Sequence, residues 1–260
     1  MFNKLARALV ALCLFPLSAF GAQIIVVNGD PPGEGFNDPT PATPVGGNPG
    51  TTVGQQALNV FQAAAEKWGG TLQSTQPILV IAFFTPLPCT ATSAVLGAAN
   101  AEWYFSNIPP AKGGKALAAD TWYQAALAEK ITRQDIVADP NDPFEMFALF
   151  NNQLGQPGCL TGNGWYYGLD HNEPANRIDL LAVVTHEFGH GLGFSVGTTN
   201  ASTGARALGF PSIWESFMLD MTTGKRWIDM TNAERAASAR NNGNLVWAGQ
   251  HGSNIVPSMA

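Results

Sequence analysis

The sequence predicts an α+β fold with a mixed β-sheet, one apolar helix beginning at Leu180 and a helical C-terminal part. Residues 77–84 form a continuous apolar run, which is typical of a buried central strand. Apolar residues at helical spacing over 54–68 predict an amphipathic helix. The expected strands and helices do not alternate regularly, which favours α+β over a doubly wound sheet.

The other elements follow from local patterns in the chain. Thr51 or Thr52 is expected to cap the helix at 54–68, and Gly69-Gly70 to end it. The remaining expectations are a first strand at 23–27, a long loop at 28–52, helices at 114–130 and 143–153, an aromatic strand at 165–169, and helices near 211–220 and 231–240.

The long loop contains side chains whose oxygens suit a calcium ion. Glu34, Asn37 and Asp38 are the candidates. Their spacing is not that of an EF-hand loop, so the preferred interpretation is an ordered surface loop, with Ca²⁺ as the alternative.

Composition limits the classes of protein that the chain can belong to. With 260 residues and 45% hydrophobic content, the chain can build one sizeable core or two lobes that share one cleft, and we expect residues 22–260 to form a single domain. The net charge of −6 argues against nucleic acid as a partner, because such binding needs clustered Lys and Arg. A protein or peptide substrate remains compatible with this charge.

Residues 1–21 have the pattern of a signal peptide. Lys4 and Arg7 precede a short apolar run at 8–15, and small residues precede Ala22. The run is too short to span a bilayer, so we expect a secreted or periplasmic protein with no membrane span after cleavage. A membrane anchor or a buried helix is the alternative interpretation.

Two of the three cysteines remain after removal of the signal peptide. Cys13 would leave with that segment, whereas Cys89 and Cys159 would stay. An even pair in an exported chain predicts one disulfide. Free buried thiols or zinc ligands are the alternatives, although two isolated cysteines lack the spacing of a structural zinc site.

The helix that Asp179 is placed to cap carries a His-Glu-x-x-His pattern. His186 and His190 are four residues apart, so they lie one turn above the other and can bind a single Zn²⁺. Glu187 is rotated away from this row, yet it can reach the water that zinc activates and take its proton as general base. Glycines at 189, 191 and 193 are expected to turn the chain after the second histidine. The alternative is two surface histidines with no metal.

The segment His186–Phe194 resembles the zincin superfamily of metallopeptidases. Segments 33–38, 93–97 and 244–247 are similar to those of exported bacterial proteins of the metalloprotease type, so the resemblance covers most of the mature chain. It implies a zincin-like catalytic domain and a secreted zinc metalloendopeptidase. Many longer relatives carry a protease-associated domain after the region around Trp247, and this chain, which stops at Ala260, is expected to lack it.

A catalytic zinc needs a third protein ligand, and the motif does not supply it. Position 196, where the metzincin branch places that ligand, is Val196. We favour Glu215, because the gluzincin branch uses a Glu on a following helix and because an acid among large apolar neighbours is costly to bury unless it is paired or bound to metal. The other candidates are Asp220 as runner-up, Asp229, His251 and, upstream, His171, which can instead bind substrate.

Two further functions are compatible with the same residues. One is a non-catalytic binding module on a zincin scaffold. The other is a zinc hydrolase that acts on a bond outside proteins. Peptide bonds are preferred because the resemblance implies them.

Overall fold

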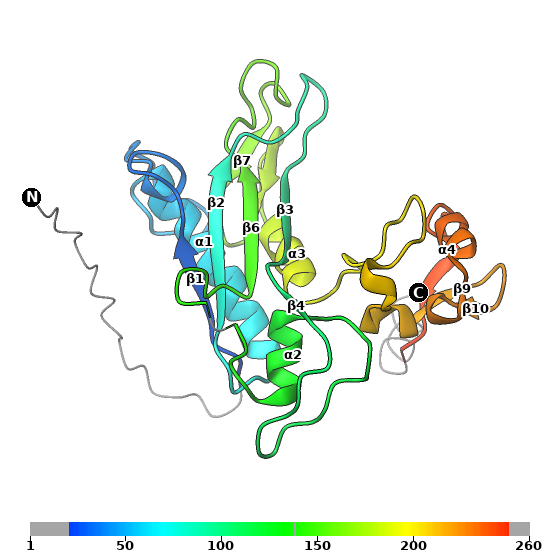
Figure 1. Ribbon diagram of the computed structural model, residues 1–260. Helices are drawn as coiled ribbons and strands as arrows, with labels where there is room; N and C mark the ends of the chain where they lie inside the picture. Colours follow the sequence, from blue (N-terminus) through cyan, green and yellow to red (C-terminus); the bar gives the residue numbers. More distant parts are fainter. Residues whose placement is uncertain (1–20, 138, 250–260) are drawn as a thin grey trace, which may run out of the picture.

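The computed structural model describes residues 21–137 and 139–249 (Figure 1). The signal peptide, except for Gly21, and His251 lie outside the described residues. Helices and several small sheets are mixed along the described chain, so the α+β prediction is confirmed at this level. No helix in these ranges is long and apolar enough to cross a membrane.

The main sheet has four strands in the order β1-β2-β6-β3. They are β1 (Ile24–Asn28), β2 (Ile78–Thr85), β6 (Met146–Asn151) and β3 (Gly97–Ala101). β1, β2 and β6 are parallel, whereas β3 runs antiparallel to β6 and forms one edge. The expected strands at 23–27 and 77–84 therefore correspond to β1 and β2.

Strand β6 corrects a sequence-based prediction. Residues 143–153 were expected to be helical, but Met146–Asn151 pairs with β2 on one side and β3 on the other. A short apolar run fits a buried helix or a buried strand equally well by periodicity. The backbone partners on both sides, which are remote in sequence, decide in favour of the strand.

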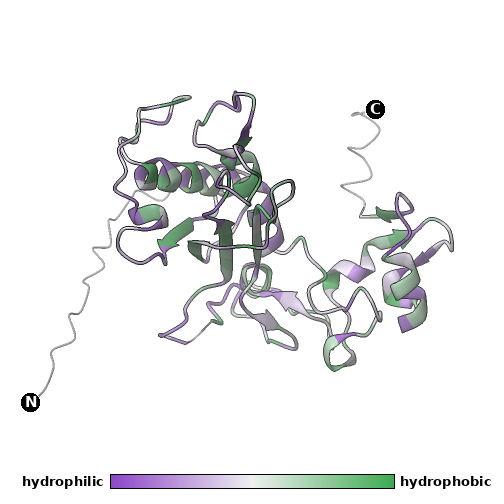
Figure 2. Ribbon diagram, turned by 90° about the horizontal axis from the view of Figure 1, so that it is seen from above, coloured by the Kyte–Doolittle hydropathy of each residue, from purple (hydrophilic) through white to green (hydrophobic). Residues whose placement is uncertain are grey.

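Helices α1 (Val53–Thr71) and α3 (Leu180–Gly191) pack into the same core as the sheet. Alternate side chains of β2 are buried in this core, so one face of the strand is covered while the other is only half-buried. Phe61 of α1 lies 4.8 Å from Phe150 and 5.9 Å from Phe188 between ring centroids. Figure 2 shows the amphipathic helix α1 beside the apolar strands.

The sequence predicts the start of α1 correctly but not its end. Thr52 caps the helix as expected, since its hydroxyl accepts a hydrogen bond from the Gln55 N–H at 3.2 Å. Gly69 does not end the helix, which continues to Thr71. A Cβ on Gly69 would lie 2.6 Å from the Ala22 carbonyl oxygen, so glycine allows the incoming chain to cross here.

The long loop after β1 is ordered by its own side chains. The Asp30 carboxylate accepts from the N–H groups of Phe36 and Phe84, both at 2.8 Å. The side-chain oxygens of Asn37 and Asp38 accept from Asn28 and Thr40 respectively. These bonds support the ordered-loop interpretation, and Ca²⁺ stays the alternative prediction.

The segment between the sheet and the C-terminal part is only partly helical. α2 covers Ala125–Thr132 and follows directly on strand β5 (Tyr123–Gln124). β5 pairs with β4 (Tyr104–Phe105). The prediction of a helix at 114–130 is therefore wrong for residues 114–124. Trp122 is held in extended pairing with Ser212, which a helix through this position would prevent.

The C-terminal part lies beyond the end of α3 (Figure 1) and is mixed rather than helical. The helix expected near 211–220 is a 3-10 turn, η3 (Ile213–Ser216), followed by strand β9 (Met218–Asp220). The helix expected at 231–240 is present as α4 (Asn232–Ser238). The remaining elements are η2 (Ala207–Gly209), β10 (Lys225–Arg226), η4 (Trp227–Asp229) and β11 (Leu245–Trp247), and β9 lies between β10 and β11 in a sheet.

The predicted disulfide is present. Cys89 and Cys159 are bonded with their Cα atoms 5.1 Å apart. The bond joins the segment after β2 to the loop after β6, across a separation of 70 residues. Such bonds persist in oxidising compartments, which is compatible with export.

Glu145, just before β6, is expected to make stability depend on pH. It is 3% exposed, and its carboxylate accepts from the Leu79 N–H at 2.5 Å. Burial, followed by the nearby charge of Glu129, raises its pKa to about 7. The unfolded carboxyl ionises near 4.5, so the folded state becomes relatively less stable as pH rises from about 4.5 to 7, by about 3 kcal/mol when complete.

Glu145→Gln removes this ionisation and keeps an oxygen for Leu79. The variant should therefore gain stability relative to the wild type between pH 4 and pH 8, as measured by urea unfolding at both pH values. Glu66→Gln, on the exposed side of α1, is the matched control and should show no such gain. A difference between Glu145→Gln and wild type that is the same at both pH values would contradict the assignment.

Candidate metal centre

Helix α3 is fixed at its start and along its side. Strand β8 (Arg177–Asp179), which pairs with β7 (Gly164–Tyr166), leads directly into it. The Asp179 carboxylate accepts from the N–H groups of Leu181 at 2.9 Å and Ala182 at 3.2 Å, so the capping prediction is confirmed. The Trp68 indole N–H of α1 donates to the Thr185 carbonyl at 2.9 Å. These bonds fix where α3 begins and how it is oriented against α1.

The glycines around the motif have a different role from the one expected. Gly189 and Gly191 lie inside α3 rather than in a turn. A Cβ on Gly191 would lie 2.2 Å from the Met146 side chain, and one on Gly189 would lie 3.3 Å from Trp68. Only Gly193, with φ of +127°, makes the turn. The first two glycines therefore allow α3 to lie close to β6 and α1.

The two motif histidines converge on one point. Their Nε2 atoms are 3.1 Å apart, and the rings are 86° apart in plane. The Nδ1 of His190 lies 2.8 Å from the Phe194 carbonyl oxygen, which can only accept, so Nδ1 is the donor. In the neutral ring this tautomer leaves the lone pair on Nε2. Ligand nitrogens about 2.0–2.1 Å from a tetrahedral zinc are spaced in this way. The two side chains thus fit a shared metal ion.

Glu187 faces the edge strand of the main sheet. Its Oε2 accepts a hydrogen bond from the Ala99 N–H of β3 at 3.1 Å. Backbone groups alternate in direction along an antiparallel strand, so Gly97 and Ala99 both direct theirs away from β6. The carboxylate therefore lies between the histidine row and the outer edge of β3.

A hollow of about 510 Å³ opens beside these residues. Its lining comes from the segment leading into β3 and from one side of α3: Val95, Leu96, Gly97, Ala182, Val183, His186 and Glu187. The carboxylate and one imidazole thus border a space large enough for part of a ligand.

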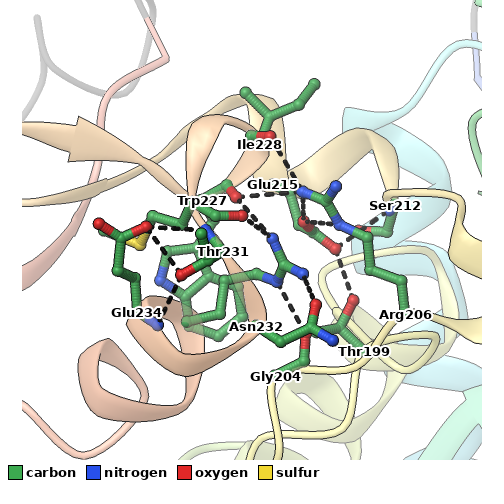
Figure 3. Close-up of polar contacts among 12 residues, drawn as sticks. Thr199, Gly204, Arg206, Ser212, Glu215, Trp227, Ile228, Thr231, Asn232 and Glu234 are labelled. Carbon is green, nitrogen blue, oxygen red and sulfur yellow. Dashed lines mark hydrogen bonds and ion pairs between the residues drawn. The ribbon is translucent and has the colours of Figure 1, made fainter.

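Glu215, the favoured third ligand, occupies another cluster (Figure 3). It is fully buried, and its Oε2 accepts from Nε and Nη2 of Arg206 at 2.8 and 2.6 Å. Its Oε1 accepts from the Thr199 hydroxyl at 2.5 Å. The buried charge is therefore compensated by Arg206, and a role as zinc ligand, which stays a prediction, would require this cluster to open.

The other candidates also have partners or positions of their own. Asp220 accepts from the N–H groups of Thr222 and Thr223, and Asp229 lies in η4 with an exposed side chain. Nδ1 of His171 lies 2.5 Å from Oδ2 of Asp179, at the opposite end of α3 from His190. Within the described ranges, no group of three or more His, Cys, Asp or Glu side chains is arranged to hold a metal ion. Among the described residues, the structure thus brings His186 and His190 together without a third such donor.

Some contributions to the site had no signal in the sequence. Ala99 acts through its backbone N–H, which any residue would supply. Trp68 acts through its indole N–H on Thr185, which is 117 residues away in the sequence. No sequence motif marks either contribution. The motif marks Phe194 only as the last residue of its segment, although the Phe194 carbonyl orients His190. Its place one turn after the second histidine is the only clue that sequence offers.

Comparisons with protein-family models, with curated proteins and with solved structures found no match to this chain. The case for function therefore depends on the residues and their geometry.

Replacement of Glu215 tests its structural role. We expect Glu215→Ala to lower the free energy of unfolding by about 3–5 kcal/mol, because Arg206, whose side chain is 15% exposed, loses the carboxylate that compensates its charge. Lys225→Ala, which breaks an exposed ion pair with Glu234 in the same part of the chain, should cost less than about 1 kcal/mol. Denaturant unfolding measures both.

The same variant separates the two roles of Glu215. Zinc content per folded molecule, measured at a temperature where circular dichroism shows a native spectrum, decides between them. Unchanged zinc with lowered stability assigns Glu215 to the ion pair. Loss of zinc with an intact fold identifies it as the third ligand.

Proposed function

We propose that this chain is an exported zinc-dependent hydrolase, specifically a metalloendopeptidase. The observation that carries the proposal is the convergence of the His186 and His190 Nε2 atoms at 3.1 Å beside Glu187. The hollow next to Glu187 and the disulfide, which suits an oxidising compartment, add support.

The three motif residues divide two tasks between them in this proposal. His186 and His190 would hold the metal through Nε2, and the Phe194 carbonyl keeps the His190 ring in the required tautomer. A bound zinc would polarise the substrate carbonyl and lower the pKa of a water molecule. Glu187 is placed to accept a proton from the water that attacks the carbonyl carbon, and to give it to the amine that leaves when the C–N bond breaks.

A peptide substrate is favoured by the backbone of β3. Gly97 and Ala99 direct their backbone groups away from β6, and Gly97 also lines the hollow. An extended peptide can add to such an edge through main-chain hydrogen bonds, independently of its side chains. The Ala99 N–H, which Glu187 now holds, becomes available to substrate when the carboxylate turns toward the water.

Two observations favour the alternative of a non-catalytic binding module. Glu187 is engaged by Ala99, and the described residues lack a third clustered donor. Such a module keeps the edge of β3 for binding and needs no reaction at the histidines.

The deciding experiment combines metal analysis with cleavage. The mature protein, beginning at Ala22 and recovered from an oxidising compartment, is analysed for zinc and incubated with casein and a mixed peptide library. We expect one zinc per chain, cleavage of internal peptide bonds, loss of cleavage with 1,10-phenanthroline and recovery on adding zinc. A zinc-loaded protein that binds peptides without cleaving them would support the binding module instead.

A further inference from the structure

The turn that follows α3 carries the carbonyl that orients the second histidine. It covers residues 193–197 and is called here the post-helix turn. Phe194 donates its N–H to the Gly189 carbonyl at 2.9 Å, and the Phe194 carbonyl oxygen lies 2.8 Å from Nδ1 of His190. A displacement of this turn would therefore move the group that orients the His190 ring.

The post-helix turn has few bonds of its own to fix it. It begins and ends with glycine, the residue with the widest choice of backbone conformations. Within it, the Ser195 N–H donates to the Gly193 carbonyl at 2.8 Å, and the Gly197 N–H donates to Ser195 Oγ at 3.1 Å. Neither bond fixes the turn against a neighbouring element. That constraint has to come from outside the turn.

Gln124 of β5 holds the post-helix turn from inside the protein. Its side chain is fully buried, and its Nε2 donates to the Ser195 carbonyl at 2.8 Å. The two residues are 71 positions apart in the sequence. Ser195 directly follows Phe194, so this bond is made one peptide unit beyond the carbonyl that contacts His190.

The amide of Gln124 is a costly choice if stability is its only purpose. Its Oε1 has no hydrogen-bond partner within residues 21–137 and 139–249, so the side chain is held there by the bond to Ser195. A buried polar atom without a partner costs free energy, whereas an apolar side chain of similar size would not. What this glutamine provides is therefore the position of the turn that it holds.

Tyr104 of β4 reaches the same turn from the paired strand. Tyr104 and Gln124 lie directly opposite each other in the β4–β5 pair, so their side chains share one face. A Cβ on Gly197 would lie 2.3 Å from the Tyr104 hydroxyl oxygen, so the glycine lets the phenol pack against the turn. The hydroxyl itself donates to Oδ1 of Asn100 in β3 at 2.8 Å. Two neighbouring side chains thus hold the turn at Ser195 and at Gly197.

We propose that Gln124 and Tyr104 are positioning residues for the proposed metal centre. By holding the post-helix turn, they keep the Phe194 carbonyl against Nδ1 of His190, and this contact selects the tautomer whose Nε2 is free for a metal ion. The inference rests on the proposed function for the metal, whereas the tautomer can be observed in the metal-free protein.

The first test follows the His190 tautomer in the full mature chain without metal. Long-range ¹H–¹⁵N correlation spectra at a pH where histidine is neutral distinguish protonated from unprotonated ring nitrogens, and His190→Ala identifies the signals. In the wild type, Nδ1 of His190 should carry the proton. In Gln124→Met, the ring should show the mixture of tautomers expected of a histidine without a fixed partner.

The second test measures zinc affinity by competition with a chromophoric chelator. Loss of a group that orients a ligand costs about 10- to 100-fold in metal affinity, so Gln124→Met should bind zinc at least about tenfold more weakly than the wild type. The same variant should lose little stability in denaturant unfolding, because it also removes an unpaired buried oxygen.

Gln56→Met is the matched control for Gln124→Met. Gln56 of α1 is also buried, but its Nε2 donates to the carbonyls of Thr43 and Gly50 at 2.7 and 2.9 Å, in the long loop after β1. The control should lose more stability than Gln124→Met and yet keep the wild-type tautomer and zinc affinity. A merely structural role of Gln124 would not produce this opposite pattern.

Tyr104→Phe tests the second contact and serves if Gln124→Met does not fold. It removes only the hydroxyl, so we expect the His190 tautomer to become mixed and zinc affinity to fall several-fold. Tyr123→Phe, at the adjacent position of β5, is the matched control. The Tyr123 hydroxyl accepts from the Ala118 N–H at 3.1 Å, and its loss should leave both measurements unchanged.

The outcomes separate the inference from the proposed function. A wild type without a proton on Nδ1 of His190, or a tautomer unchanged in both Gln124→Met and Tyr104→Phe, overturns the inference. The expected tautomer changes in a protein that binds no zinc keep the positioning of His190 and reject the proposed metal centre. Zinc binding by the wild type with equal affinity in both variants does the reverse.

Discussion

Glu187→Gln is expected to retain zinc while peptide hydrolysis falls by about 10²–10⁴-fold, the usual cost of removing a general base. Gln has nearly the same shape as Glu but cannot take a proton from water. It also keeps an oxygen that can accept from the Ala99 N–H, so the contact between α3 and β3 should survive. The loss should therefore appear in kcat rather than in folding.

The measurement is a steady-state assay on a cleavable peptide, together with zinc analysis and thermal unfolding of the same sample. Glu66→Gln, an exposed position on α1, is the matched control and should be fully active. Equal activity of Glu187→Gln and wild type would remove this residue from the mechanism. Loss of zinc would instead identify Glu187 as a ligand.

His190→Ala should abolish stoichiometric zinc binding at micromolar concentrations. The variant removes one of the two converging nitrogens and also the ring that the Phe194 carbonyl orients. Even the loss of a group that only orients a ligand costs about 10- to 100-fold in metal affinity, so loss of a ligand itself should cost more. Competition with a chromophoric chelator measures the affinity.

His171→Ala provides the matched histidine control. This residue contacts Asp179 at the start of α3, away from the converging nitrogens, and its loss should leave zinc affinity unchanged. Undiminished zinc in His190→Ala would contradict the proposed metal centre, whatever the activity. Equal loss in the two variants would point to a disturbed helix rather than to a missing ligand.

Local signals in the sequence were sufficient for the helix of the candidate site. Asp179 specifies where α3 begins, because its short side chain satisfies N–H groups that the first turn leaves free. The four-residue spacing then places His186 and His190 on one face, since a helix has 3.6 residues per turn. The disulfide also followed from sequence, because only Cys89 and Cys159 remained to form it.

Tertiary structure decided the features that depend on partners remote in the chain. Residues 146–151 become a strand because β2 and β3 satisfy their backbone on both sides, which no local pattern specifies. Glu215 had to be compensated because it is buried, but whether a metal or a cation from the protein would do so was open in the sequence. In the structure Arg206 supplies the charge, since the folding of the C-terminal part brings its guanidinium within 2.6 Å of the carboxylate.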